Sequence, residues 1–280
     1  MATWAAFALA PDAVLVSSAF NAPAFASVAL VLCGFLLLLA RQTTTAVTTT
    51  DPALPAPADL DSETREQLPD YDDIYAEWHA LSNQSLSPGL LLVNVALTQG
   101  LFLAVLVGAA VLAGVPRSAL GVDASGLSTL ALAIGVGLGI VLYVANQVGA
   151  SMTDRLGLAA NDELRSSLAP ESARGWAILL LGVLPTVALF EEVMFRAALV
   201  GVLAVGFGIS PWLLAVGSSL VFALGHGVQG PAGIVVTGTL GFVLAAAFIL
   251  TESLLAVVVA HYLVNALEFV VHEWLGVEWT

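Results

Sequence analysis

Three short motifs in the last third of the chain carry ionisable and amide side chains that could do chemistry. Carboxylate and imidazole groups can take a proton from water, and imidazole and amide groups can donate hydrogen bonds to an oxyanion. The motifs are E-E-x-x-x-R (Glu191, Glu192, Arg196), F-x-x-x-H (Phe222, His226) and H-x-x-x-N (His261, Asn265). If these residues converge in a bundle, they can bind a metal, activate water or donate hydrogen bonds to an oxyanion.

The charges of the first motif lie inside an apolar run long enough to cross a membrane. An ionisable side chain at the bilayer centre costs on the order of 3 kcal/mol, so a functional role is the first hypothesis. Glu192 and Arg196 are four residues apart, which predicts an ion pair on one helix face. Glu191 lies about 140° from Arg196 around an α-helix. The spacing therefore predicts that Glu191 has no local partner and can act as a general base.

Each histidine motif also places its two polar or aromatic residues on one helix face, because they are four residues apart. His226 stands at the end of its apolar run, whereas His261 and Asn265 lie deeper in the last run. The face of His261 and Asn265 continues to Glu268 and His272. We interpret Glu268 and His272 as residues of the membrane interface rather than catalysts.

The composition indicates how these motifs are held. Of 280 residues, 59% are hydrophobic and only 10% are charged, which is too apolar for a soluble domain. A membrane-spanning helix needs about 20 apolar residues. We expect an all-α, polytopic transmembrane helical bundle of about seven spans, within a range of six to eight, with the active site inside the bundle. The expected spans are 22–40, 89–115, 127–150, 176–208, two helices within 211–250, and 253–271.

Two features shape the catalytic part of this bundle. Pro185 predicts a kink in 176–208, which is too short for two crossings. The string "GHGVQGPAG" predicts a turn that splits 211–250. The expected organisation is an N-terminal segment with the first span (1–40), an acidic Thr- and Pro-rich linker (41–87), two spans with a polar loop (88–174) and a catalytic core of about four helices (175–280). The linker is expected to hold one short helix near residues 75–81.

The charge balance narrows the partners and the orientation. The chain has 21 acidic and 7 basic residues, no lysine and a net charge of -14. This balance suits a halophilic source, and it argues against a nucleic-acid partner because phosphates could not be neutralised. The positive-inside rule predicts a multi-pass cell-membrane protein whose N-terminus lies outside and whose active site lies toward the cytoplasm. The inside loops then hold Arg41, Arg65, Arg155, Arg165 and Arg174, and only Arg117 lies opposite.

The three motifs, in this order on separate apolar segments, resemble the CPBP family of intramembrane proteases. This family includes the type II CAAX prenyl endopeptidases and proteins linked to bacteriocin processing and immunity. The resemblance covers about residues 176–272 and implies proteolysis of a membrane-associated, in some relatives prenylated, protein or peptide. It gives each motif residue a role: Glu191 and His226 activate water, His261 and Asn265 stabilise the oxyanion, Glu192 and Arg196 support the helix, and Phe222 shapes the pocket.

The need for a metal stays open at this point. The H-E-x-x-H motif of zinc peptidases is absent, and the closest string is "HEWLG" at His272. We favour a glutamate-dependent reaction that requires no cofactor. If a divalent metal such as zinc is present, its expected ligands are Glu191, His226 and His261. The sequence gives no indication of the oligomeric state.

Two other functions remain open. A serine protease of rhomboid type would use Ser218 or Ser219 in the string "GSSL", although no second glycine follows the serines. A non-catalytic protein, either a proton-coupled transporter or an immunity-type binding protein, would use the same buried acids and histidines without hydrolysis.

Overall fold

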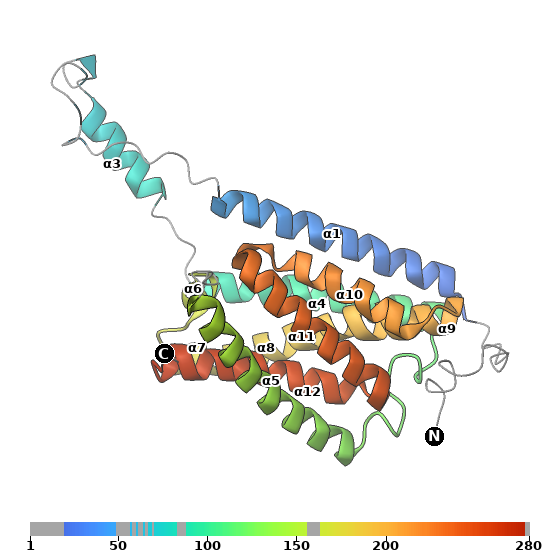
Figure 1. Ribbon diagram of the computed structural model, residues 1–280. Helices are drawn as coiled ribbons and strands as arrows, with labels where there is room; N and C mark the ends of the chain where they lie inside the picture. Colours follow the sequence, from blue (N-terminus) through green and yellow to red (C-terminus); the bar gives the residue numbers. More distant parts are fainter. Residues whose placement is uncertain are drawn as a thin grey trace.

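The computed structural model describes residues 20–48, 57, 60, 64, 67–68, 70–82, 88–155 and 163–277, and within them it contains helices and no strands (Figure 1). The helices are α1 (Ala22–Thr48), α3 (Tyr71–Ser82), α4 (Pro88–Ala113), α5 (Thr129–Arg155), α6 (Glu163–Leu168), α7 (Ala173–Ile178), η2 (Leu179–Val183), α8 (Leu184–Glu192), η3 (Val193–Val202), α9 (Leu203–Phe207), α10 (Pro211–Gly225), η4 (Gly227–Gln229), α11 (Gly230–Thr251), α12 (Leu254–Glu268) and η5 (Phe269–Trp274).

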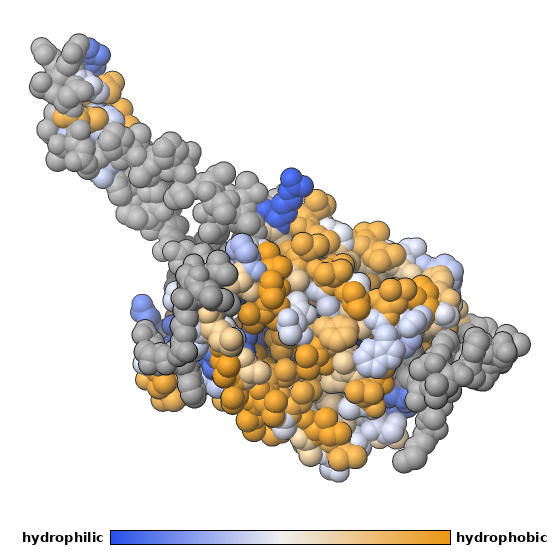
Figure 2. Space-filling model, viewed as in Figure 1, coloured by the Kyte–Doolittle hydropathy of each residue, from blue (hydrophilic) through white to orange (hydrophobic). Residues whose placement is uncertain are grey.

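Among the described residues, 6 helices are long and apolar enough to cross a membrane. They are 22–41, 92–113, 129–152, 173–207, 230–251 and 254–274. Apolar side chains cover most of the visible face of the bundle (Figure 2). The chain is therefore a multi-pass helical membrane protein, and the predicted fold class is confirmed.

The seventh apolar helix, α10, is shorter than expected for a span. It has 15 residues, which rise about 22 Å and fall short of a hydrocarbon core of about 30 Å. The predicted split of 211–250 into two helices is correct. The turn between them follows Gly225, so α10 has 15 residues and α11 has 22. His226 follows directly after the end of α10.

The 173–207 segment is one continuous helix, as predicted, but it contains two π-helical segments, of 5 and 10 residues, in which the helix is wider. The π-helical segment η2 ends at Val183, two residues before Pro185, and a second π-helical segment, η3, begins directly after Glu192. Proline has no N–H and its ring crowds the carbonyl four residues earlier, so the wider turn at η2 accommodates Pro185. The π-helical geometry of η3 changes which side chains share a helix face next to the two glutamates.

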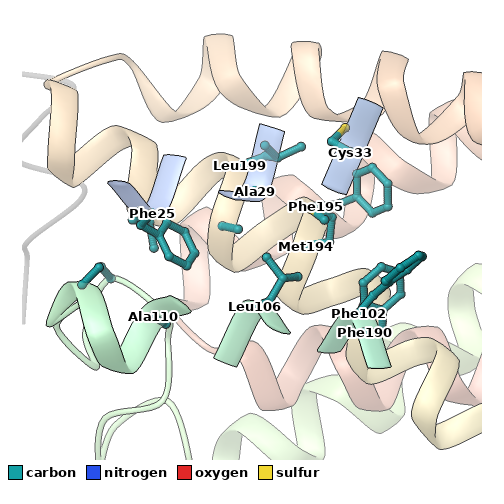
Figure 3. Packing of buried hydrophobic residues seen from close by; sticks show 14 of the residues in the cluster. Phe25, Ala29, Cys33, Phe102, Leu106, Ala110, Phe190, Met194, Phe195 and Leu199 are labelled. Carbon is teal, nitrogen blue, oxygen red and sulfur yellow. The ribbon is translucent and has the colours of Figure 1, made fainter. Parts of the chain in front are cut away.

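A hydrophobic core fixes this helix against α1 and α4. In Figure 3, Phe25 and Ala29 of α1 and Leu106 of α4 point toward Met194 and Leu199 of η3. The rings of Phe102 in α4 and Phe190 in α8 lie 6.0 Å apart, centroid to centroid. These contacts position the turn that carries the two glutamates.

On the other side of the site, α12 packs along α5, and this pair has the most extensive contact between two helices. Two glycines of α5 allow the close approach: a Cβ atom on Gly135 would lie 2.6 Å from the Ala256 carbonyl oxygen, and one on Gly139 would lie 3.0 Å from that of Ala260. Small residues four apart on facing helices are typical of close packing in membranes. This seam sets the position of His261, the residue after Ala260.

A polar cluster joins α5, α6 and the end of α12. Glu268 Oε1 accepts hydrogen bonds from Asn146 Nδ2 and from Gln147 Nε2 at 2.7 Å. Arg165 Nη1 lies 3.5 Å from Glu268 Oε2, and His272 Nε2 lies 3.0 Å from Gln147 Oε1. Glu268 and His272 therefore also link the end of α12 to α5, where Asn146 and Gln147 supply the amide partners. Their predicted place at the membrane interface stays a prediction.

Glycine substitutions in α5 test the seam with α12. We expect Gly135→Ala to lower the free energy of unfolding by about 1–3 kcal/mol, because the added methyl group meets a backbone oxygen that cannot move alone. Gly137, two residues along, has no atom within 4 Å of the Cβ position. Gly137→Ala is therefore the matched control, and we expect it to leave stability unchanged or raise it by about 1 kcal/mol. Thermal unfolding of the purified protein in detergent measures both, and equal stability of the two variants would contradict the assigned seam.

Candidate active site

The three motifs meet around the imidazole ring of His261. Glu191 and Glu192 are the last two residues of α8, and Arg196 follows in η3. His261 lies in α12, packed against α8. Helices that are far apart in the sequence thus bring acidic, basic and imidazole groups together inside the bundle.

Glu192 is bonded to two partners through one oxygen. Its Oε1 accepts a hydrogen bond from Arg196 Nη1 at 2.7 Å and lies 2.6 Å from His261 Nδ1. The exposed fractions of these side chains are 0% for Glu192, 1% for Arg196 and 3% for His261. The structure contains the ion pair that the spacing predicts. The contact with His261 was not predicted, and it connects the supporting pair directly to a candidate catalytic residue.

Glu191 approaches the other side of the same ring. Its Oε2 lies 3.5 Å from His261 Nε2, and its side chain is 13% exposed. The expected angle of about 140° from Arg196 assumes α-helical geometry and does not apply across the start of η3, where the helix widens. Glu191 thus joins the cluster through His261 of α12, and among the described residues it forms no ion pair with Arg196, in line with the prediction that it has no partner on its own helix.

Arg196 is fixed by two further contacts. Its Nη2 donates a hydrogen bond to the carbonyl oxygen of Gly241 in α11 at 3.0 Å. Its guanidinium carbon lies 4.8 Å from the ring centroid of Phe222, a cation–π contact. A Cβ on Gly241 would lie 3.1 Å from the Phe222 ring, so the absence of a side chain lets α11 approach. Gly241 is a residue of the site that no sequence motif indicated.

Phe222 also places the two histidines. Its ring centroid lies 4.5 Å from that of His226 and 6.1 Å from that of His261. His226 Nδ1 lies 2.8 Å from the Phe222 carbonyl oxygen. A carbonyl can only accept, so this contact assigns the proton of a neutral His226 to Nδ1. The lone pair of Nε2 is then available to bind a proton.

Asn265 lies one turn after His261 on the same helix and is partly buried. No side-chain hydrogen bond from Asn265 to another residue of the described chain occurs. The four expected catalytic residues are thus divided: Glu191 contacts His261 directly, whereas His226 and Asn265 are placed beside them without joining them by an ion pair or hydrogen bond within the described residues.

The expected metal ligands do not form a metal site in this arrangement. Among the described residues, no group of three acidic, histidine or cysteine side chains could hold a metal ion. The expected ligands Glu191, His226 and His261 are not brought together as such a group in the described part of the chain, and we derive no step through a metal.

The two serines of the rhomboid-type alternative are both buried and bonded to backbone. Ser218 Oγ donates to the Phe195 carbonyl oxygen and Ser219 Oγ donates to that of Ala215, each at 2.6 Å. A serine nucleophile needs a base within hydrogen-bond reach of its hydroxyl. Ser218 instead ties α10 to the π-helical segment next to the charged cluster, which is a structural role.

Comparison with known proteins supports the resemblance. Residues 173–267 match the family model described as Type II CAAX prenyl endopeptidase Rce1-like. No curated protein and no solved structure matched the chain. The matched region holds all three motifs, so the family predicted from them is confirmed. The match supports a CAAX-type intramembrane endopeptidase as the general class, which implies a lipid bilayer and a peptide or protein substrate in general.

Removing the Arg196 charge tests how far the buried cluster depends on it. We expect Arg196→Met to lower the free energy of unfolding by about 3–5 kcal/mol, because the buried Glu192 carboxylate loses its cation. Arg174→Met is the matched control, since Arg174 is exposed at the start of the same helix. Thermal unfolding in detergent compares the two variants, and an Arg196→Met protein as stable as the control would contradict the assigned ion pair.

Proposed function

We propose that the chain hydrolyses a peptide bond of a membrane-associated protein or peptide, with Glu191 as the general base. The accessibility of the two neighbouring acids carries the proposal. Glu191 is 13% exposed, whereas Glu192 is 0% exposed and already accepts two hydrogen bonds. Only Glu191 can receive a water molecule without first breaking the ion pair.

In the proposed reaction, Glu191 takes a proton from water while the water oxygen bonds to the carbonyl carbon. His226, which follows α10, accepts a hydrogen bond from the same water at its Nε2 lone pair. The carbonyl oxygen becomes an oxyanion, and His261 with the Asn265 amide donates hydrogen bonds to it. The C–N bond then breaks as the proton on Glu191 passes to the leaving amine.

The proposed substrate class is taken from the family match and is defined by its chemical type alone. A type II CAAX prenyl endopeptidase acts on a prenylated C-terminal peptide, and an apolar bundle surface gives a lipid-modified chain access from the bilayer. We therefore propose a prenylated C-terminal peptide as the first substrate to test. An unprenylated membrane peptide is the alternative.

The orientation is also a proposal. The ends of α1 and α5, with α6 and the start of α7, carry Arg41, Arg155, Arg165 and Arg174, and the opposite loop carries Arg117. By the positive-inside rule, the arginine-rich end faces the cytoplasm. Since His226 follows the short helix α10 at that end, the proposed active site would be reached from the cytoplasmic side.

Substitution of the general base tests the proposal. We expect Glu191→Gln to lower kcat at least about 100-fold while the protein stays folded, because the amide cannot accept the proton. The assay uses the purified protein in liposomes with a quenched fluorescent peptide carrying a farnesylated CAAX-type end, and the same peptide without the farnesyl group. The double variant Ser218→Ala/Ser219→Ala is the control and should still cleave.

Two outcomes would contradict this proposal. Full cleavage by Glu191→Gln together with loss in the serine variant would favour a serine protease. If Glu191→Gln keeps the protein's effect in the native cell, a binding or transport function would replace hydrolysis. A comparison of membrane and secreted proteomes with and without Glu191→Gln would show uncleaved termini if the proposal is correct.

A metal-independent reaction is a separate prediction. We expect the purified protein to contain far less than one zinc per chain and to keep its cleavage rate after dialysis against a chelator. The reason is that, among the described residues, no group of three acidic, histidine or cysteine side chains could hold a metal ion. Elemental analysis and the peptide assay measure both quantities. Activity that is lost on chelation and restored by zinc would show that the ligands rearrange around a metal.

A further inference from the structure

A tyrosine next to the site bonds to the backbone of the helix that carries the two glutamates. Tyr262 Oη donates a hydrogen bond to the carbonyl oxygen of Leu180 in η2 at 3.1 Å. Tyr262 follows His261 directly in α12, at one of the unassigned positions of the H-x-x-x-N motif. A tyrosine hydroxyl inside a protein usually finds a hydrogen-bond partner. The sequence of the long helix explains why the partner here is a backbone carbonyl.

The Leu180 carbonyl oxygen is available for this contact because of Pro185. In η2 the N–H group of Leu184 donates to the carbonyl oxygen of Leu179, five residues earlier. The next hydrogen bond in this π-helical register would run from residue 185 to Leu180. Proline has no N–H group, so the Leu180 oxygen has no backbone donor in this register. A carbonyl without a donor is costly inside a membrane bundle, and the Tyr262 hydroxyl supplies the donor.

The apolar part of Tyr262 is held at the same place. Its ring packs against a hydrophobic cluster that contains Leu179 and Val183 of η2 and Phe269 at the end of α12. The hydroxyl group bonds to Leu180, between these two residues of η2. Both the apolar and the polar part of the side chain are therefore fixed against one short segment of the long helix.

Two successive residues of α12 thus make polar contacts with the helix that carries the glutamates. His261 Nδ1 lies 2.6 Å from Glu192 Oε1, and Tyr262 reaches Leu180. Successive residues point about 100° apart around an α-helix. Two polar contacts in different directions determine the rotation of α12 against this helix more narrowly than one contact does. Asn265 lies one turn after His261, so the same rotation sets its place.

We propose that Tyr262 is a positioning residue for the groups of α12 that act in the reaction. Its bond to the carbonyl that Pro185 leaves without a backbone donor fixes the rotation of α12. This rotation sets where His261 and Asn265 stand relative to Glu191. The inference rests on the proposed hydrolysis, and it gives the kink residue Pro185 a part in the site as well. A displacement of about 1 Å between reacting groups can lower a rate about 100-fold.

A double-mutant cycle on the cleavage rate tests the inference. We expect Tyr262→Phe to lower kcat at least about 10-fold, because the ring stays packed while α12 loses its second polar contact. KM should stay within about twofold of the wild-type value, since the hydroxyl does not touch the substrate. In Pro185→Ala, residue 185 gains an N–H group that competes for the Leu180 oxygen. Adding Tyr262→Phe to Pro185→Ala should therefore lower kcat by less than about twofold. The quenched farnesylated peptide in liposomes measures both constants.

Spin-label distances in detergent test the position of α12 without substrate. Nitroxide labels on Leu181→Cys in η2 and on Leu275→Cys, the residue after η5, occupy two exposed positions. Cys33→Ser removes the one cysteine of the native sequence. The protein with Tyr262 should give a narrow distance distribution, and Tyr262→Phe should broaden or shift it. In the Pro185→Ala background, the same Tyr262→Phe change should leave the distribution unaltered.

Several outcomes would overturn the inference. Equal losses of kcat from Tyr262→Phe in both backgrounds would show that the hydroxyl does not act through the carbonyl left by Pro185. Easier thermal unfolding with unchanged kcat and KM would reduce Tyr262 to a structural support. If Pro185→Ala does not fold, Tyr262→Phe decides alone, and an unchanged kcat or an unchanged distance distribution overturns the inference. If the wild-type protein cleaves no peptide, the proposed hydrolysis fails, and the spin-label distances still decide whether the bond fixes α12.

Discussion

A single carboxylate oxygen, Oε1 of Glu192, connects the helices of the site. It accepts from Arg196 on its own helix and from His261 on α12, at 2.7 and 2.6 Å. Arg196 extends the connection to α11 through the Gly241 carbonyl and to α10 through the Phe222 ring. A buried ion pair is stable only when further hydrogen bonds complete it. Every element that carries a motif residue is thus held by contacts of this one pair.

These contacts require the backbones of neighbouring helices to approach each other closely, and small residues allow this approach. In the bilayer no hydrophobic force drives one helix onto another, so close van der Waals packing and polar contacts between helices hold the bundle together. Gly135 and Gly139 bring α5 onto α12, and Gly241 brings α11 onto Arg196. A Cβ on Gly201 would collide with the Ala119 carbonyl oxygen, so η3 also meets the 114–128 loop directly. The glycines place the charged groups within hydrogen-bond distance.

The sequence predicted the parts of this structure that depend on local pattern. Apolar runs gave the helices, and the four-residue spacing gave the Glu192–Arg196 pair and the Phe222–His226 face. It missed the widened turn in η3, because an α-helical angle was assumed for every residue. It also missed the Glu192–His261 contact, which joins residues 69 positions apart, and the part played by Gly241. These depend on how whole helices pack, and no spacing within one helix contains that information.

The cluster is poorly suited to stability alone. Glu192 Oε2 and Arg196 Nε are buried without a hydrogen-bond partner within the described chain, and an apolar core of the same volume would have neither group. The difference in exposure between its two acids, Glu191 and Glu192, suits a reaction instead. In the proposed reaction, the acid that exchanges a proton is Glu191, which has an exposed fraction, whereas Glu192, which pairs with Arg196, is fully buried. Hydrolysis inside a membrane has to create and remove an oxyanion where charge is expensive. If Glu191 takes the proton of the attacking water as the oxyanion forms, one negative charge replaces another beside the buried Arg196, and the net charge of the site does not change.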